Sequence, residues 1–300
     1  MKVLNFLLVL IILASLATCN EAKTEKKKED DTLSTGTIRV SVDESLKPLM
    51  EAEFNVFGYQ YPNAHLIISY KPETEVFNDF KNDSARAIIV TRELSSGEMD
   101  YFRSIQYIPV SLAFARDGIS IIVNHKNTPD SFTVSELKTI LSGKSNQNLM
   151  VVFDNTASST LRWLKDSLLK KEPLGKNCFA LHTNSDVIDY VSNHENVIGI
   201  IGTSWISDLD DTLVRNRLKS VKRASIAAED SKDYLEPYQS EIKTERYALA
   251  RTIYSIQRDG KLGLGSGLQH FLYSEKGQFI VLKFGMLPYN QPERSIRLKL

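Results

Sequence analysis

Apolar residues follow two kinds of spacing along the chain beyond residue 37. Some runs alternate with polar residues or are apolar throughout, as strands are, and others recur every three or four residues, as in helices. The predicted strands are 38–42, 66–68, 87–90, 107–110, 119–123, 150–153, 197–201, 221–226 and 247–256. The predicted helices are 48–58, 73–80, 98–103, 133–142, 158–169, 186–191, 267–273 and 277–282. This alternation predicts an α/β fold.

The strand 87–90 reads Ala-Ile-Ile-Val and is apolar at every position. A strand of this kind is buried on both faces, as in parallel sheets that are covered by helices on each side. We therefore expect a sheet that is parallel at its centre. About 260 residues of alternating strands and helices exceed what one sheet usually needs, so the pattern predicts two α/β lobes.

Charge and composition exclude several classes of protein. The 300 residues contain 37 Lys and Arg against 37 Asp and Glu, so no overall positive field exists to hold nucleic acid by its phosphates. The two cysteines, Cys19 and Cys178, and the five histidines show neither zinc-site spacing nor a disulfide framework. We therefore expect no nucleic-acid partner, no metal site and no cofactor.

The first residues resemble a secretion signal. Lys2 precedes an apolar run over 3–17 that is too short to span a bilayer permanently. Leu16-Ala17-Thr18-Cys19 resembles the lipobox of bacterial lipoproteins, which implies cleavage after a signal peptide at 1–18 and lipidation of Cys19. The charged segment that follows predicts a flexible tether at 19–36. Contact of its lysines 26–28 with anionic headgroups is the alternative.

Three polar loops follow predicted strands, at 41–46, 91–96 and 154–162. The carboxyl ends of strands in an open α/β sheet meet helix N-termini, whose free amides attract anions. The third loop contains Ser158-Ser159-Thr160 and, two positions later, Arg162, which together offer hydroxyls and a positive charge to one oxyanion. The alternative for this cluster is a helix N-cap and nothing more.

Segments in all parts of the mature chain are similar to one family. They are 41–49, 91–94, 117–129, 137–143, 158–162, 198–202 and 277–288, with Ser158 to Arg162 similar to the family's Ser-Gly-Thr-Arg. The chain thereby resembles the phosphate-binding (PstS-like) family of type II periplasmic solute-binding proteins of ABC phosphate importers. The resemblance implies two α/β lobes, each a mainly parallel sheet flanked by helices, with a cleft between them. Lobe I comprises 37–116 and 246–300, and lobe II comprises 117–245.

The resemblance also implies a set of ligand-binding residues: Ser45, Leu46, Thr74, Thr91, Arg92, Asp117, Asp154, Ser158, Ser159, Thr160 and Arg162. Asp117 is the candidate acceptor for a proton of hydrogen phosphate, a bond that sulfate does not offer. Asp154 stands where several members of the family have an arginine. Arg92 and Arg162 are candidate replacements for that cation, and Asp154 is alternatively a second proton acceptor.

The function implied is capture of inorganic phosphate for the permease subunits of an ABC importer, by hinge closure of a monomer. We expect the chain on the extracytoplasmic face of a bacterial cell envelope, held to the membrane by its lipid anchor. No Gly-x-Ser-x-Gly elbow accompanies the serines, so we expect no catalytic residue and no enzyme activity. The alternative is a structural or sensory lipoprotein of the same fold that binds another ligand or a protein partner.

Overall fold

The computed structural model describes residues 31–127, 129–170, 172–259 and 262–290. The predicted signal peptide, the lipidation site Cys19 and most of the tether lie outside these residues. Within the described ranges, no helix is both long and apolar enough to cross a bilayer.

In the described part of the chain, ten strands form one sheet with the path β2-β1-β3-β11-β4-β8-β6-β7, and β9 and β12 pair with β4 beside it. The strands of the path are β1 (Gly36–Asp43), β2 (Ala64–Lys71), β3 (Ala87–Val90), β4 (Val110–Asn124), β6 (Met150–Phe153), β7 (Cys178–Ala180), β8 (Val197–Gly202) and β11 (Ala250–Gln257). The others are β9 (Val221–Arg223) and β12 (Leu287–Pro288). A separate two-stranded sheet joins β5 (Ser131–Thr133) to β10 (Ser225–Ala227).

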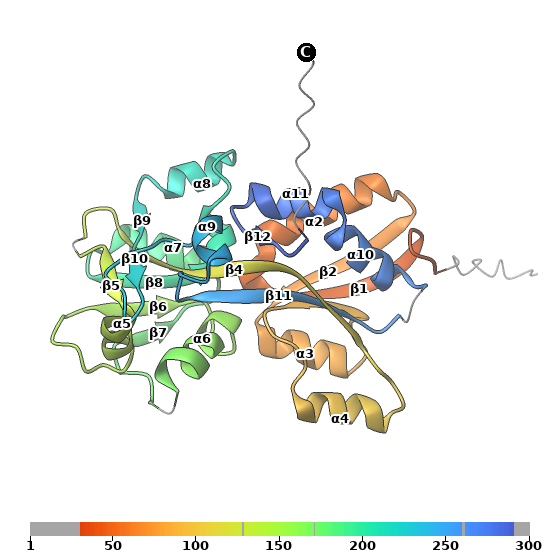
Figure 1. Ribbon diagram of the computed structural model, residues 1–300, viewed down its shortest axis with the longest axis horizontal. Helices are drawn as coiled ribbons and strands as arrows, with labels where there is room; N and C mark the ends of the chain where they lie inside the picture. The colour runs from red at the N-terminus through yellow and green to blue at the C-terminus, as the bar shows by residue number, and fades with distance from the viewer. Residues whose placement is uncertain (1–30, 128, 171, 260–261, 291–300) are drawn as a thin grey trace, which may run out of the picture. The chain divides into compact units, whose positions relative to one another are not determined.

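Helices cover both faces of the sheet. They are α2 (Lys47–Gln60), α3 (Glu73–Lys81), α4 (Ser96–Ser104), α5 (Val134–Leu141), α6 (Ser159–Leu164), α7 (Asn184–Asn193), α8 (Thr212–Arg217), α9 (Gln239–Lys243), α10 (Leu264–Tyr273) and α11 (Glu275–Lys283). Short turns η1 (Glu44–Leu46) and η3 (Thr203–Ile206) follow β1 and β8, and the π-helical η2 (Lys165–Leu169) extends α6. In Figure 1, α2, α10 and α11 lie on one side of β1 to β3, and α3 and α4 lie on the other.

A local signal explains where the predicted helix α5 begins and ends. Thr133 accepts a hydrogen bond from the Glu136 amide while the Glu136 carboxylate accepts one from the Thr133 amide, and Gly143 follows the helix at φ +69°. The sequence of α5 predicts this reciprocal capping. By contrast, β5, β7, α8 and α9 were not predicted, because three to six residues are too few to establish a period.

The strand directions correct one expectation. Strand β1 runs parallel to β2 and β3, and β6 runs parallel to β7 and β8. The central strands β11 and β4 are instead antiparallel to their neighbours β3 and β8 and to each other. The prediction of a sheet that is parallel at its centre is therefore wrong. A strand buried on both faces has the same apolar sequence whichever way its neighbours run, so the pattern could not reveal the direction.

Strand β4 is continuous over fifteen residues. The prediction of two separate strands at 107–110 and 119–123 is wrong, and residues 107–109 precede the strand. The first part of β4 pairs with β11, and its last part pairs with β8 and β9. The polar residue Asp117 fits inside a strand because Arg251 lies opposite it on β11. Figure 1 shows β4 and β11 running between the two groups of parallel strands.

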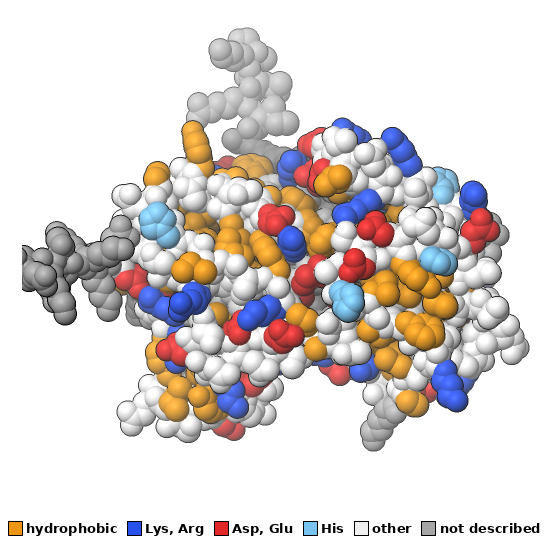
Figure 2. All heavy atoms as spheres, turned by 180° about the vertical axis from the view of Figure 1, so that it is seen from behind, with side chains coloured by type: hydrophobic (Ala, Val, Ile, Leu, Met, Phe, Trp, Pro, Cys, Tyr) orange, Lys and Arg blue, Asp and Glu red, His pale blue; other side chains and the backbone are white. Residues whose placement is uncertain are grey.

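The buried apolar residues form separate cores. One core around α2, α10 and α11 and another around α3 and α4 draw on residues from Ile38 to Ala115 and from Ile253 to Met286. Two further cores, around α5 and α6 and around α7, draw on residues from Ile119 to Leu249. The lobe boundaries near 116 and 246 stay a prediction. On the face that Figure 2 shows, positive and negative side chains are interspersed, in keeping with a formal net charge of zero.

Gly202, at the end of β8, packs directly against the backbone of η1. A Cβ atom at this position would lie 2.3 Å from the Ser45 carbonyl oxygen, closer than any real contact. We expect Gly202→Ala to lower the free energy of unfolding by about 1–3 kcal/mol, because the two backbones must separate. Gly58→Ala is the matched control, since a Cβ atom on this α2 residue meets nothing within 4 Å. Urea unfolding of both variants is the measurement, and equal stability would contradict the close packing.

Candidate functional site

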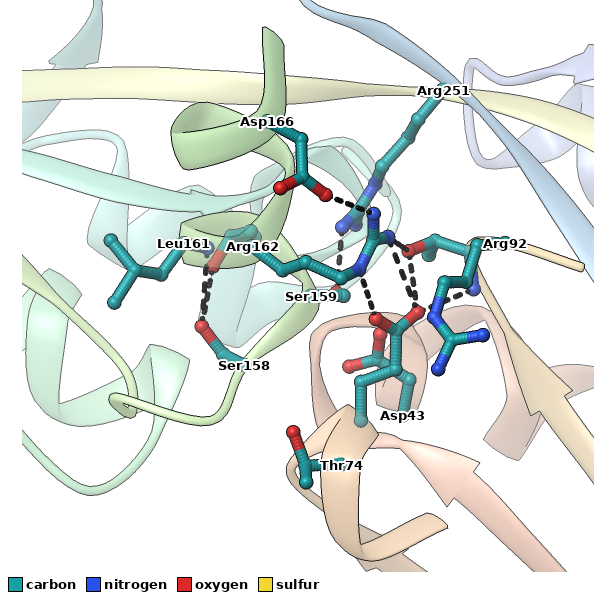
Figure 3. A network of polar contacts seen from close by, with 12 residues as sticks. Asp43, Thr74, Arg92, Ser158, Ser159, Leu161, Arg162, Asp166 and Arg251 are labelled. Atoms are coloured by element: carbon teal, nitrogen blue, oxygen red, sulfur yellow. Dashed lines mark hydrogen bonds and ion pairs between the residues drawn. The ribbon is translucent and has the colours of Figure 1, made fainter. Parts of the chain in front are cut away.

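A buried pair of serine hydroxyls joins the turn after β1 to the start of α6. Ser45 Oγ and Ser159 Oγ lie 3.2 Å apart, and both residues are fully buried. Arg251 of β11 donates from Nη1 to Ser159 Oγ at 2.8 Å and from Nη2 to Ser45 Oγ at 3.0 Å. Figure 3 shows the Arg251 guanidinium reaching Ser159. The structure thus brings two predicted site residues together around an arginine that was not predicted.

Asp117 is the ionic partner of Arg251. Arg251 donates from Nε at 3.2 Å and from Nη2 at 2.9 Å to Asp117 Oδ2, and both residues are almost completely buried. The other oxygen, Oδ1, has no hydrogen-bond partner among the described residues. Burial raises the pKa of Asp117, and the neighbouring guanidinium opposes that rise. The role of Asp117 as the acceptor of a ligand proton stays a prediction.

Sequence reasoning missed Arg251, although a signal was present. A charged residue interrupts the apolar run 247–256, and a charge inside a buried strand needs an opposite charge. The predicted polar residue Asp117 lies on another strand far away in the sequence. Only the register of β4 on β11 pairs the two.

The predicted hydroxyl cluster lies at the N-terminus of α6. Ser158 is the N-cap residue of α6 and accepts a hydrogen bond from the Leu161 amide at 3.3 Å, while its additional role as a ligand-binding residue stays a prediction. Thr160 donates to Asp154 Oδ1 at 3.0 Å, and Asn184 donates to Asp154 Oδ2 at 3.2 Å. Asp154 thus organises polar side chains of the protein itself, and burial raises its pKa.

A second cluster connects α3, the end of β3 and α6. Arg162 donates from Nε to Glu73 Oε2 and from Nη2 to Thr91 Oγ1, the latter at 3.0 Å. Thr91 in turn donates to Glu73 Oε1 from its amide at 3.0 Å and from its hydroxyl at 2.9 Å. Two predicted residues, Thr91 and Arg162, therefore meet, and a buried glutamate lies between them.

Three predicted residues, as the structure describes them, form no hydrogen bond with Ser45, Ser159 or Arg251. Arg92 donates to both carboxylate oxygens of Glu98, at 2.7 and 2.9 Å, and its guanidinium lies 3.6 Å from the centre of the Phe77 ring. Thr74 is exposed and donates to the carbonyl oxygen of Ala157 at 3.2 Å. Leu46 is buried in the core around α2. The ligand roles of these residues stay predictions.

Two further carboxyl groups have strongly shifted pKa values. Burial, with the nearby charge of Glu73 as the second cause, raises the pKa of Asp43 from 3.8 to about 7. Burial likewise raises the pKa of Glu44 from 4.5 to about 7, although hydrogen bonds from Asn184 oppose the change. Near neutral pH, both groups therefore titrate at the edge of the site.

These raised pKa values predict a pH dependence of stability. Because both pKa values are higher in the folded protein, the folded state binds more protons than the unfolded chain between about pH 4 and pH 7. We therefore expect the free energy of unfolding to fall as the pH rises from 5 to 8, by on the order of 1–3 kcal/mol for each carboxyl group. The double variant Asp43→Asn, Glu44→Gln should show a smaller fall. Urea unfolding at both pH values measures it, and a rise in stability would contradict it.

No group of three or more His, Cys, Asp or Glu residues in the described ranges is arranged to hold a metal ion. The chemistry that these residues offer is hydrogen bonding and charge. Hydroxyls and guanidinium groups suit an oxyanion, and unpartnered carboxylate oxygens suit a ligand that can donate a proton.

Residues 27–276 match the family model described as PBP superfamily domain. The chain therefore belongs to this family. The phosphate-binding protein PstS of Staphylococcus saprophyticus is 27% identical over 168 residues, which are 53% of this chain and 50% of that protein. The chain thus spans about half the length of this curated relative.

Solved structures show the same fold. A phosphate ABC transporter substrate-binding protein with bound phosphate from Clostridium perfringens, described as putative, matches with a TM-score of 0.72, 20% identity and coverage of 84% of this chain and 99% of its own. An ABC-type phosphate transport receptor from Vibrio cholerae matches with a TM-score of 0.62, 20% identity and coverage of 83% and 99%. The fold is thus the mixed α/β fold of type II periplasmic binding proteins.

Proposed function

We propose that this chain captures inorganic phosphate outside the cytoplasm and delivers it to an ABC importer. The observation that carries the proposal is the buried guanidinium of Arg251, which donates to Ser45 in the turn after β1 and to Ser159 at the start of α6. These groups are ones that bind oxyanions, and they lie where loops after parallel strands meet the start of a helix. The relatives named above bind or transport phosphate according to their names, which supports the same ligand here.

Closure around the ligand follows from the connections of the sheet. Strands β4 and β11 link the group β1 to β3 with the group β6 to β8. In our proposal, the lobes 37–116 with 246–300 and 117–245 bend about these strands, and ligand held by both lobes favours the closed form. The closed monomer is the form that the permease subunits recognise.

The membrane attachment belongs to the proposal as well. The lipobox-like segment before Cys19 lies outside the described residues, and its sequence supports a lipid anchor on the extracytoplasmic face of a bacterial envelope. In the proposal, the charged segment 19–36 then serves as a flexible tether between the lipid anchor and the folded part of the chain.

Calorimetric titration with phosphate and with sulfate tests the proposed ligand. We expect phosphate to bind and sulfate to bind at least about 100-fold more weakly, because the buried oxygen Asp117 Oδ1 accepts a proton that sulfate does not carry. A protein that releases no heat with phosphate and shows no thermal shift in its presence would contradict the proposal.

A specific observation favours a second candidate, a sensory or structural lipoprotein with another ligand. The buried and half-buried carboxyl groups around the site outnumber its arginines Arg162 and Arg251; Asp43, Glu73, Asp117 and Asp154 are buried, and Glu44 is half-buried. A ligand with more hydrogen-bond donors than phosphate would suit such a surface. If the same titration detects no binding of phosphate, the result would favour this second candidate.

A further inference from the structure

The carboxylate of Glu73 is bound as an oxyanion would be. Its Oε1 accepts hydrogen bonds from the amide and the hydroxyl of Thr91, and its Oε2 accepts one from Arg162. Arg162 Nη2 also reaches Oε1 at 3.5 Å, so the guanidinium contacts both oxygens. Glu73 is 2% exposed, whereas the side chain of Arg162 is 28% exposed, so the ion pair lies at the edge of the buried region.

The donors that hold Glu73 are two of the predicted ligand-binding residues. Thr91 follows β3, and Arg162 reaches over from α6, as Figure 3 shows for its side chain. A carboxylate and a phosphate use the same donors, because both present charged oxygens in a plane that a guanidinium can bridge. Glu73 therefore occupies a donor set that suits an external anion.

This donor set is part of the same site as the buried serines. Ser159 and Arg162 lie three positions apart on α6, and Ser159 is bonded to Arg251 while Arg162 is bonded to Glu73. One short helix therefore carries a residue of each cluster. Burial has the largest influence on the pKa of Asp43 and on that of Arg251, and the charge of Glu73 also raises both.

We propose that Glu73 is a built-in competitor of the ligand, which an incoming oxyanion must displace from Thr91 and Arg162. The inference rests on the proposed function, because it concerns the affinity of the same site. An anion displaces Glu73 only if it carries more negative charge or more acceptor oxygens than a single carboxylate group. Glu73 therefore selects for doubly charged or multidentate oxyanions against simple carboxylates. It also ties α3 to α6 until the ligand replaces it.

Glu73→Gln keeps the size of the side chain and removes its charge. We expect it to bind inorganic phosphate at least tenfold more tightly than the unmodified chain in calorimetric titrations at one pH and salt concentration. The matched control is Glu75→Gln, an exposed residue on the same helix, whose affinity should stay within twofold. Circular dichroism and urea unfolding verify that each variant is folded.

A second variant, Glu73→Ala, separates competition from a purely structural role. It leaves room for a carboxylate from solution, so millimolar acetate should weaken its phosphate binding at least threefold, whereas the unmodified chain should be insensitive to acetate. A structural role alone would not create this sensitivity.

Each outcome decides the inference. Tighter binding by Glu73→Gln, together with acetate competition in Glu73→Ala, supports it. Unchanged or weaker binding in a chain that does bind phosphate overturns it and leaves the proposed function intact. If Glu73→Gln binds phosphate and the unmodified chain does not, the result supports competition by Glu73 and overturns the proposed function of the unmodified chain. If neither the unmodified chain nor any variant binds phosphate, both the inference and the proposed function are overturned.

Discussion

Arg251→Met is expected to abolish phosphate binding and to lower the free energy of unfolding by about 3–5 kcal/mol. Arg251 is 4% exposed and provides the positive charge beside Asp117. Without it, Asp117 is a buried charge with no compensation, and both Ser45 and Ser159 lose a charged donor. Urea unfolding and calorimetric titration measure the two effects.

The double variant Arg251→Met, Asp117→Leu separates stability from binding. Removing both charges should restore most of the lost stability, because no unpaired charge then stays buried. Phosphate binding should stay lost, because the guanidinium itself is the donor. Arg116→Met is the surface control, since Arg116 pairs with Glu245, whose side chain is 75% exposed. This substitution should lower the free energy of unfolding by less than about 1 kcal/mol. If Arg251→Met is as stable as Arg116→Met, the buried ion pair between Arg251 and Asp117 does not form.

Ser159→Phe is expected to lower phosphate affinity by at least about 100-fold, equivalent to about 2.7 kcal/mol of binding free energy. Ser159 is completely buried between Ser45 and Arg251, so a phenyl ring has no room unless the turn after β1 and the helix α6 separate. Such separation removes contacts that a ligand in the closed protein would need. Phosphate titration and thermal unfolding of the variant provide the measurements.

The matched control for this substitution is Ser96→Phe. Ser96 occupies the first position of α4, as Ser159 does in α6, but it is exposed. The control should bind phosphate as the unmodified chain does. If Ser159→Phe also binds normally, the buried serine pair is not part of the ligand site.

Much of the fold was predictable because its signals are local. Apolar spacing placed the strands and helices of 38–90 within a few residues of their observed bounds, and the spacing of Thr133 and Glu136 located the start of α5. The predicted loops at 41–46, 91–96 and 154–162 do carry several of the buried polar residues of the site, among them Ser45, Thr91 and Ser159. Hydroxyls and charges directly after strands are visible without any knowledge of packing.

Other parts of the site depend on pairs of residues that are distant in the sequence. Arg251 faces Asp117 across 134 positions, and Arg162 meets Glu73 across 89. Their partners are set by strand register and helix packing, which no local pattern encodes. Arg92, predicted at the site, pairs instead with Glu98, six positions away, because the capping of α4 by Ser95 holds the Glu98 carboxylate near it.

The sequence by itself determined most of the longer strands and helices and the loops in which polar chemistry gathers, because these depend on residues that are neighbours in the chain, and its composition determined the absence of a net charge. Only the tertiary structure decided the antiparallel centre of the sheet, the continuity of β4 and the choice of charge partners. The charge partners are set by packing because a buried carboxylate or guanidinium is stable only beside an opposite charge, and that charge can lie anywhere along the chain.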